Sequence, residues 1–134
     1  MGAWGYGNFD NDTAADWAFS LEESTDLSLI TEAINAALEE DYIDSDIGCE
    51  ALVAIEAVAR LKGKWGEKSA YSEPVDNWIE RNNFEPSKDL IDSSNKALKL
   101  IAGQNSELYE LWAETEDLTS WLEEIKNLEQ RINA

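Results

Sequence analysis

The chain has 134 residues, and 29 Asp and Glu against 10 Lys and Arg give it a formal charge of -19 at pH 7. Such a charge repels the phosphates of nucleic acids and anionic membrane surfaces, so we expect the protein to bind neither. It attracts a basic protein, a peptide or a cation instead. Six Trp, four Tyr and three Phe supply a core, which argues against disorder, and the length fits one domain over residues 1–134.

The charge is unevenly distributed along the chain. Residues 1–59 contain 14 Asp and Glu and no Lys or Arg, whereas the remainder holds 15 acidic and all 10 basic residues. We therefore expect a basic partner to bind the acids of the amino-terminal part.

The residue types present exclude several kinds of chemistry. With no His, the chain cannot form a histidine-based triad, a Cys–His dyad or a His-ligated zinc site. The single Cys49 cannot form an internal disulfide, and its place in an apolar helix favours a small buried thiol. No apolar run is long enough for a signal peptide or a membrane span, so we expect a cytoplasmic protein, and no motif indicates a cofactor.

Glycine and aromatic residues alternate in residues 1–12. The glycines are Gly2, Gly5 and Gly7, and the rings are Trp4, Tyr6 and Phe9. This composition is too flexible for a helix and too aromatic for a loose tail, which predicts an irregular arm held down by its rings. A small-molecule pocket lined by Trp4, Tyr6 and Trp17 is an alternative, but packing in the core is the favoured interpretation of these rings.

Apolar residues recur at spacings of three and four through most of the remaining chain, which is the periodicity of α-helices. Helices are predicted over residues 13–22, 26–39, 45–62, 74–81, 87–102, 106–112 and 116–133. No segment sustains the alternation of apolar and polar residues that a strand shows. The fold class is therefore predicted to be all-α, a compact bundle of six or seven helices.

The stretch from Asp44 to Gly63 is predicted to be the buried central helix of this bundle. Its apolar residues cover more than half of the helix circumference, so it needs neighbours on several sides. Asp44 or Ser45 can cap its start, and Gly63 suits a left-handed stop. Glu56 and Arg60, four residues apart, are predicted to form a pair on an edge stripe worth about 0.3–0.5 kcal/mol.

The last predicted helix carries apolar residues at nearly heptad spacing, namely Leu118, Trp121, Leu122, Ile125, Leu128 and Ile132. The run is too short for a coiled coil, so an intramolecular core face is favoured over a dimer seam. We expect a monomer or a weak homodimer.

The opening residues M-G-A-W-G-Y-G-N-F-D-N-D-T-A-A-D-W resemble the start of a small bacterial family, domain of unknown function 4259, whose members begin M-G-x-W-G-x-G-x-F-x-N-D. The matching positions are Gly2, Trp4, Gly5, Gly7, Phe9, Asn11, Asp12 and Trp17. The helix E-A-L-V-A-I-E-A-V-A continues the resemblance more loosely. The resemblance implies a bacterial origin and a mostly helical fold, and it carries no catalytic residues across because the family has no established activity.

The acidic composition favours a non-enzymatic binding protein, and the specific hypothesis is an immunity-type protein that neutralises a basic toxin. A compact acidic domain can dock on the basic active-site surface of a nuclease-like toxin, and electrostatic steering makes this association fast. The contact residues predicted from the negative half are Asp10, Asp12, Asp41 and Asp44.

A hydrolase that depends on a divalent metal is the alternative, because carboxylates alone can hold Mg²⁺ or Mn²⁺. Its candidate ligands are Asp10, Asp12, Asp16, Glu50 and Glu56. The spacing of the first three does not match a calcium-binding loop, and capping of the following helix is the favoured role for this segment. Glu50 and Glu56 lie six residues apart in a helix and so point roughly 120° apart, a poor arrangement for sharing one ion.

Overall fold

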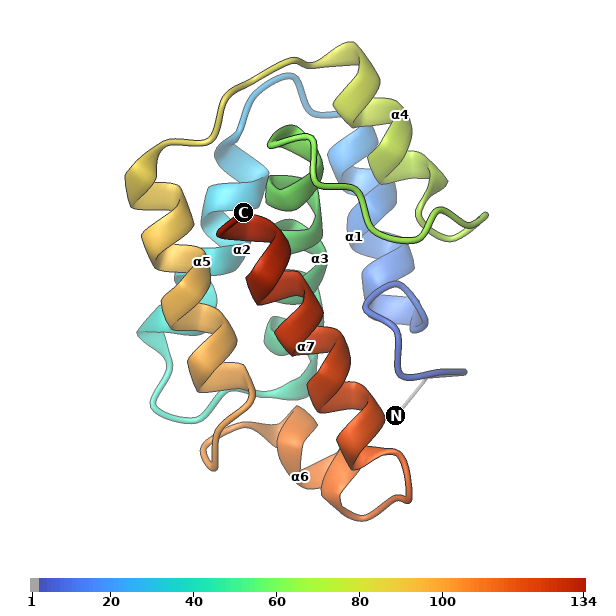
Figure 1. Ribbon diagram of the computed structural model, residues 1–134, viewed down its shortest axis with the longest axis vertical. Helices are drawn as coiled ribbons and strands as arrows, with labels where there is room; N and C mark the ends of the chain where they lie inside the picture. The colour runs from blue at the N-terminus through green and yellow to red at the C-terminus, as the bar shows by residue number, and fades with distance from the viewer. Residues whose placement is uncertain (1–2) are drawn as a thin grey trace.

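The structure, a computed structural model, describes residues 3–134 and consists of packed helices (Figure 1). Within these residues there are seven helices and no strand: α1 (Asp12–Glu22), α2 (Ser28–Glu39), α3 (Ser45–Leu61), α4 (Glu73–Arg81), α5 (Lys88–Ile101), α6 (Glu107–Ala113) and α7 (Leu118–Ile132). The predicted all-α class is confirmed, and a helix is present in each predicted segment. Gly2, which belongs to the predicted arm, lies outside the described residues.

Helix α3 occupies the middle of the bundle and contacts each of the other six helices (Figure 1). Every residue from 51 to 60 is buried, so this helix has no solvent-facing side over its central turns. The helix begins where the Asp44 carboxylate accepts a hydrogen bond of 2.9 Å from the backbone N–H of Ile47. It ends before Gly63, whose φ of 79° is a left-handed conformation that suits glycine. The prediction of a buried central helix is confirmed.

Polar side chains cap three of the helices that surround α3. Asn11 accepts a hydrogen bond from the Ala14 N–H at the start of α1, at 2.8 Å. Ser87 and Ser106 do the same at the starts of α5 and α6, as the sequence predicts. Because each cap satisfies a backbone donor that the first helical turn leaves unpaired, these residues set where the helices begin.

Helix α7 packs its apolar seam against the body of the molecule. Trp121, Ile125, Leu128 and Ile132 are at most 5% exposed and belong to the hydrophobic core. The interpretation of this seam as an intramolecular core face is therefore confirmed. None of the helices in residues 3–134 combines the length and apolar character that crossing a membrane requires.

The arm before α1 turns back on itself. The Asp10 N–H donates to the Gly7 carbonyl, and the Trp4 N–H donates to the Asp10 carbonyl, both at 3.0 Å. The arm runs beside the first half of α7 (Figure 1). Phe9 is buried, but Trp4 is 49% exposed and Tyr6 40% exposed, so the expectation that all of its rings hold the arm down is wrong. Because of the turn, the side chains that enter the core are those of Asn8 and Phe9.

Candidate functional site

A network of buried charges lies at the centre of the site. Glu56 of α3 binds Arg60 one helical turn further on, with 2.5 Å between Oε1 and Nη1. Arg131 of α7 binds both oxygens of Glu56, at 3.0 Å and 2.8 Å. Arg60 also donates from Nε to Asp76 of α4 at 2.7 Å. The network therefore joins α3, α4 and α7.

The predicted pairing of Glu56 with Arg60 is confirmed, but its placement on an edge stripe of α3 is wrong. Their side chains are 5% and 0% exposed. Helical periodicity correctly separates these residues from the apolar face of α3, but it carries no information on what covers them. Here α4, α7 and the arm cover both side chains. At the surface such a pair would contribute little to stability, but inside the protein each charge needs an opposite charge or a hydrogen bond to offset its loss of solvation.

The arm completes this network. The side-chain amide of Asn8 donates a hydrogen bond of 2.7 Å from Nδ2 to Oε2 of Glu56. The ring of Phe9 lies against the Arg60 guanidinium, with 5.0 Å between its centroid and Cζ, a favourable cation–π contact. Trp65, in the loop after α3, lies against the same guanidinium at 5.5 Å. Asn8 and Phe9, in the opening segment that carries the family resemblance, thus contact the buried charges of Glu56 and Arg60.

The charges of the network determine the protonation of Glu56. Burial by itself raises the pKa of this carboxyl, but the hydrogen bonds and charge of Arg131, with Arg60 and Asn8, outweigh burial and lower it below its ordinary value. Glu56 is therefore ionised at neutral pH and fully occupied by its partners.

Two glycines of the arm lie directly against the Asp10 carboxylate. A Cβ atom at Gly5 or at Gly7 would lie 2.7 Å from Oδ2 of Asp10, closer than real Cβ contacts allow. The side chain of Asp10 therefore occupies the space that these two glycines leave.

An open groove of about 420 Å³ lies beside the arm, between the loop after α3 and helix α7. Its charged and aromatic lining residues are Tyr6, Phe9, Asp10, Glu56, Glu67, Tyr71 and Glu124. Trp4 extends this face, because its ring lies 5.0 Å from that of Tyr71. Trp4, Tyr6 and Tyr71 are each at least 40% exposed. The groove therefore combines exposed aromatic rings with carboxylates.

The carboxylates of this groove influence one another. The pKa of Glu124 is raised, first by partial burial and then by the negative charges of Glu56, Glu67 and Asp10, with Arg131 opposing them. Within residues 3–134, the salt bridges include neither Asp10, Glu67 nor Glu124. A positive group in the groove would relieve this repulsion.

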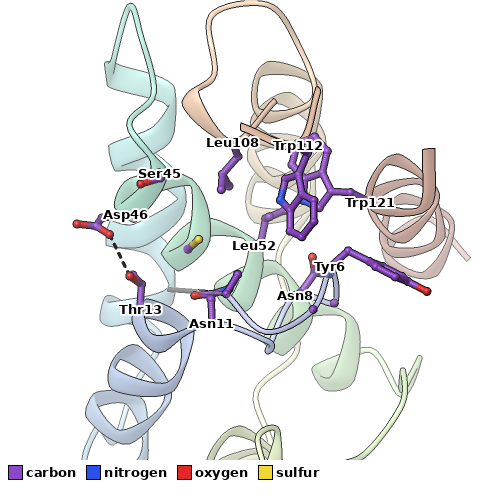
Figure 2. A pocket seen from close by; sticks show the side chains of 14 residues that line it. Tyr6, Asn8, Asn11, Thr13, Ser45, Asp46, Leu52, Leu108, Trp112 and Trp121 are labelled. Atoms are coloured by element: carbon purple, nitrogen blue, oxygen red, sulfur yellow. Dashed lines mark hydrogen bonds between the residues drawn. The ribbon is translucent and has the colours of Figure 1, made fainter. Parts of the chain in front are cut away.

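The four predicted partner-binding residues do not form one cluster. Asp10 lines the groove, whereas Asp12 is exposed in the first turn of α1. Asp44 caps α3, and Asp41 is exposed in the connection before it. The starts of α1 and α3 are neighbours, because Thr13 donates a hydrogen bond of 3.0 Å to Asp46 (Figure 2). Asp12 and Asp44 therefore lie at the same end of the bundle, whereas Asp10 faces the groove.

The five candidate metal ligands are also dispersed. Asp16 and Glu50 line a shallow hollow together with Asp46, and the pKa of Glu50 is raised by partial burial and by the charges of Asp46 and Asp44. Glu56, roughly 120° around α3 from Glu50, is held by Arg60 and Arg131. In the part of the chain that the structure describes, no three acidic or Cys side chains are placed to hold one metal ion.

The predicted aromatic pocket is not a single site. Trp17 is 5% exposed and packs in the core, as the favoured interpretation held, whereas Trp4 and Tyr6 lie at the surface. Trp4 lies against Tyr71, and Tyr6 lines the groove together with Tyr71 and Glu124. The sequence analysis missed Tyr71 and Glu124. No sequence signal could have found them, because they lie in a loop and a helix far along the chain.

These features define a small helical protein with a tethered arm and an acidic, aromatic groove. The family pattern described as domain of unknown function 4259 matches residues 2–124, and the chain belongs to this family. The predicted resemblance to this family is thereby confirmed. No curated protein and no solved structure shows significant similarity to it.

Proposed function

We propose that this protein is a non-enzymatic binding protein that receives a basic partner protein on the face formed by Trp4, Tyr6, Tyr71, Asp10, Glu67 and Glu124. The observation that carries the proposal is the gathering of three exposed aromatic rings beside these three carboxylates. Rings and carboxylates together suit Lys and Arg side chains, because a cation gains from the carboxylate charge and from the ring face. We name this surface the arm face.

The arm face has the composition of a binding hot spot in a protein–protein interface. Exposed Trp and Tyr supply large contact areas with few rotatable bonds, and such residues dominate binding energy in many complexes. The anchoring of the arm through Asn8 and Phe9 supports the same proposal, because a surface held in place before binding loses less entropy on association. Asp12, Asp41 and Asp44 add long-range attraction rather than contacts at the centre.

The partner class that fits this surface best is a basic toxin, which the protein would neutralise inside a bacterial cell. A toxin that acts on nucleic acid presents a basic surface, and a charge of -19 attracts such a surface strongly. Rapid association is an advantage for an immunity protein, because the toxin must be captured before it acts.

The test is a binding measurement with the product of a neighbouring gene, which the proposal expects to be a basic protein. Trp4→Ala combined with Tyr71→Ala is expected to weaken the affinity at least tenfold, which corresponds to about 1.4 kcal/mol. Phe19→Ala is the matched control, because Phe19 is an aromatic residue that is 61% exposed on α1 and does not line the groove. The association rate is expected to fall steeply as salt is added.

Two outcomes would contradict the proposal. One is a partner that is neutral or acidic, and the other is a loss of affinity in the Phe19→Ala control as large as in the arm-face variant. The metal-dependent hydrolase is separated from the binding protein by calorimetry with Mg²⁺ or Mn²⁺. Stoichiometric binding tighter than about 1 mM would favour the hydrolase.

A further inference from the structure

A second hollow, the inner hollow, lies on the side of the arm that faces the bundle and shares the arm residues 5–8 with the groove. It is enclosed by the arm, the first half of α3, and helices α6 and α7. Figure 2 shows the indole rings of Trp112 and Trp121 side by side above Leu52, with Asn8 below them. The volume open to a water-sized molecule is only about 20 Å³. A site needs roughly 10–15 Å³ of such volume to hold one water, so this hollow accommodates one and nothing larger.

One polar atom faces this hollow without a partner. Asn8 is 5% exposed, and its side-chain oxygen Oδ1 is buried with no hydrogen bond to the residues that the structure describes. Figure 2 shows this oxygen turned toward the two indole rings. A buried acceptor left without a donor costs about 1–3 kcal/mol, so native proteins rarely leave one unsatisfied.

The hydrogen bond to Glu56 determines which way the Asn8 side-chain amide is oriented. Nδ2 lies 2.7 Å from Oε2 of Glu56, which is ionised and can only accept hydrogen bonds. Rotating the amide by half a turn would place an oxygen against this carboxylate and lose the bond. The oxygen of Asn8 must therefore face the hollow, and its donor must come from there.

We propose that the hollow binds one internal water molecule, which donates a hydrogen bond to Oδ1 of Asn8. The two indoles that border the hollow carry N–H donors, and a water can accept from an indole while it donates to Asn8. The bound water completes the hydrogen bonding of the one arm side chain that reaches Glu56. The water is thus an integral part of the attachment between the arm and the bundle. This role does not depend on which partner the arm face binds.

A high-resolution crystal structure of the full chain tests the proposal directly. The expected result is a single density peak about 2.7–3.2 Å from Oδ1 of Asn8, bordered by Trp112 and Trp121. An empty hollow would overturn the proposal, and so would a protein donor paired with Oδ1.

Magnetic relaxation dispersion of water oxygen nuclei provides a second test in solution, because it counts long-lived internal waters. Asn8→Leu is expected to remove one such water, since the variant lacks the buried acceptor Oδ1 to which this water donates and the larger apolar side chain takes up part of the space. Asn95→Leu is the matched control, because this Asn pairs with Asn133 at the surface and lies outside the hollow. An unchanged count in folded Asn8→Leu would overturn the proposal. If that variant does not fold, the presence or absence of water density at Asn8 Oδ1 in the wild-type crystal structure decides whether the proposal holds.

Discussion

Asn8 and Glu56, 48 residues apart in the sequence, are joined by a hydrogen bond of 2.7 Å inside the protein. Through this bond the arm becomes part of the core, because Glu56 also holds Arg60 and Arg131. The exposed rings of the arm are therefore presented from a fixed base. Changes in the buried network should affect the arm, whereas changes at the surface of the arm should leave the bundle intact.

Removing the charge of Glu56 should strongly destabilise the protein. In Glu56→Gln, the buried Arg60 and the partly buried Arg131 lose their shared carboxylate, and breaking a buried pair in this way costs about 3–5 kcal/mol. Urea unfolding followed by tryptophan fluorescence measures this loss. Lys88→Met is the control, because the Lys88–Asp92 pair is exposed and is worth at most about 1 kcal/mol. Equal losses in the two variants would contradict the role given to the network.

The contribution of Glu56 should disappear in acid. Its pKa in the folded protein is below its ordinary value, so the unfolded chain takes up a proton at this residue at a higher pH than the folded chain does. The stabilisation is therefore complete above about pH 4.3, the ordinary value for Glu, and is lost as the pH falls through the lower folded value. Urea unfolding at several pH values should show the gap between wild type and Glu56→Gln narrowing below about pH 4. A gap that stays constant down to pH 3 would show that the pKa of Glu56 is not lowered.

Gly7 and Asp10 should be energetically coupled. Gly7→Ala places a Cβ atom against the Asp10 carboxylate, which must then move, at a cost of about 1 kcal/mol. Replacing Asp10 by Ala in the same chain removes the clash, so the double variant should be more stable than the sum of the single changes predicts. Gly63→Ala serves as the control. It is strained by its φ of 79° and not by Asp10, so its cost should add to that of Asp10→Ala. Additive costs at Gly7 as well would refute the close contact.

Cys49 should be unreactive in the folded protein. Its side chain borders the inner hollow, and burial, followed by the charges of Asp46, Glu50 and Asp44, raises the pKa of the thiol to about 12. At pH 8 almost none of it is thiolate, which is the reactive form. A thiol reagent such as Ellman's reagent should label the protein in urea and leave it nearly unlabelled in buffer. Rapid labelling without urea would indicate that the hollow opens readily.

Much of the fold is predictable from the sequence because it depends on residues close together in the chain. The helix starts at Ser87 and Ser106 follow from side chains that bind backbone groups three residues away. The end of α3 follows from Gly63, and the burial of α3 follows from an apolar surface too wide for an exposed helix. Each of these features is encoded within a few helical turns.

The candidate site depended instead on segments brought together by folding. The predicted surface pair of Glu56 and Arg60 is buried because Asn8, Asp76 and Arg131 come from three other segments to cover and bind it. The groove exists because the arm, the loop after α3 and helix α7 meet beside that network.

The sequence by itself determined the helical class, the positions of the helices to within about two residues, the charge and the absence of histidine, since these rest on composition and local periodicity. Only the tertiary structure decided which carboxylates are neutralised by arginine and which face an open groove. The physical reason is that periodicity tells which side of a helix is polar, while the neighbours packed there decide whether that side meets water, an opposite charge or a partner.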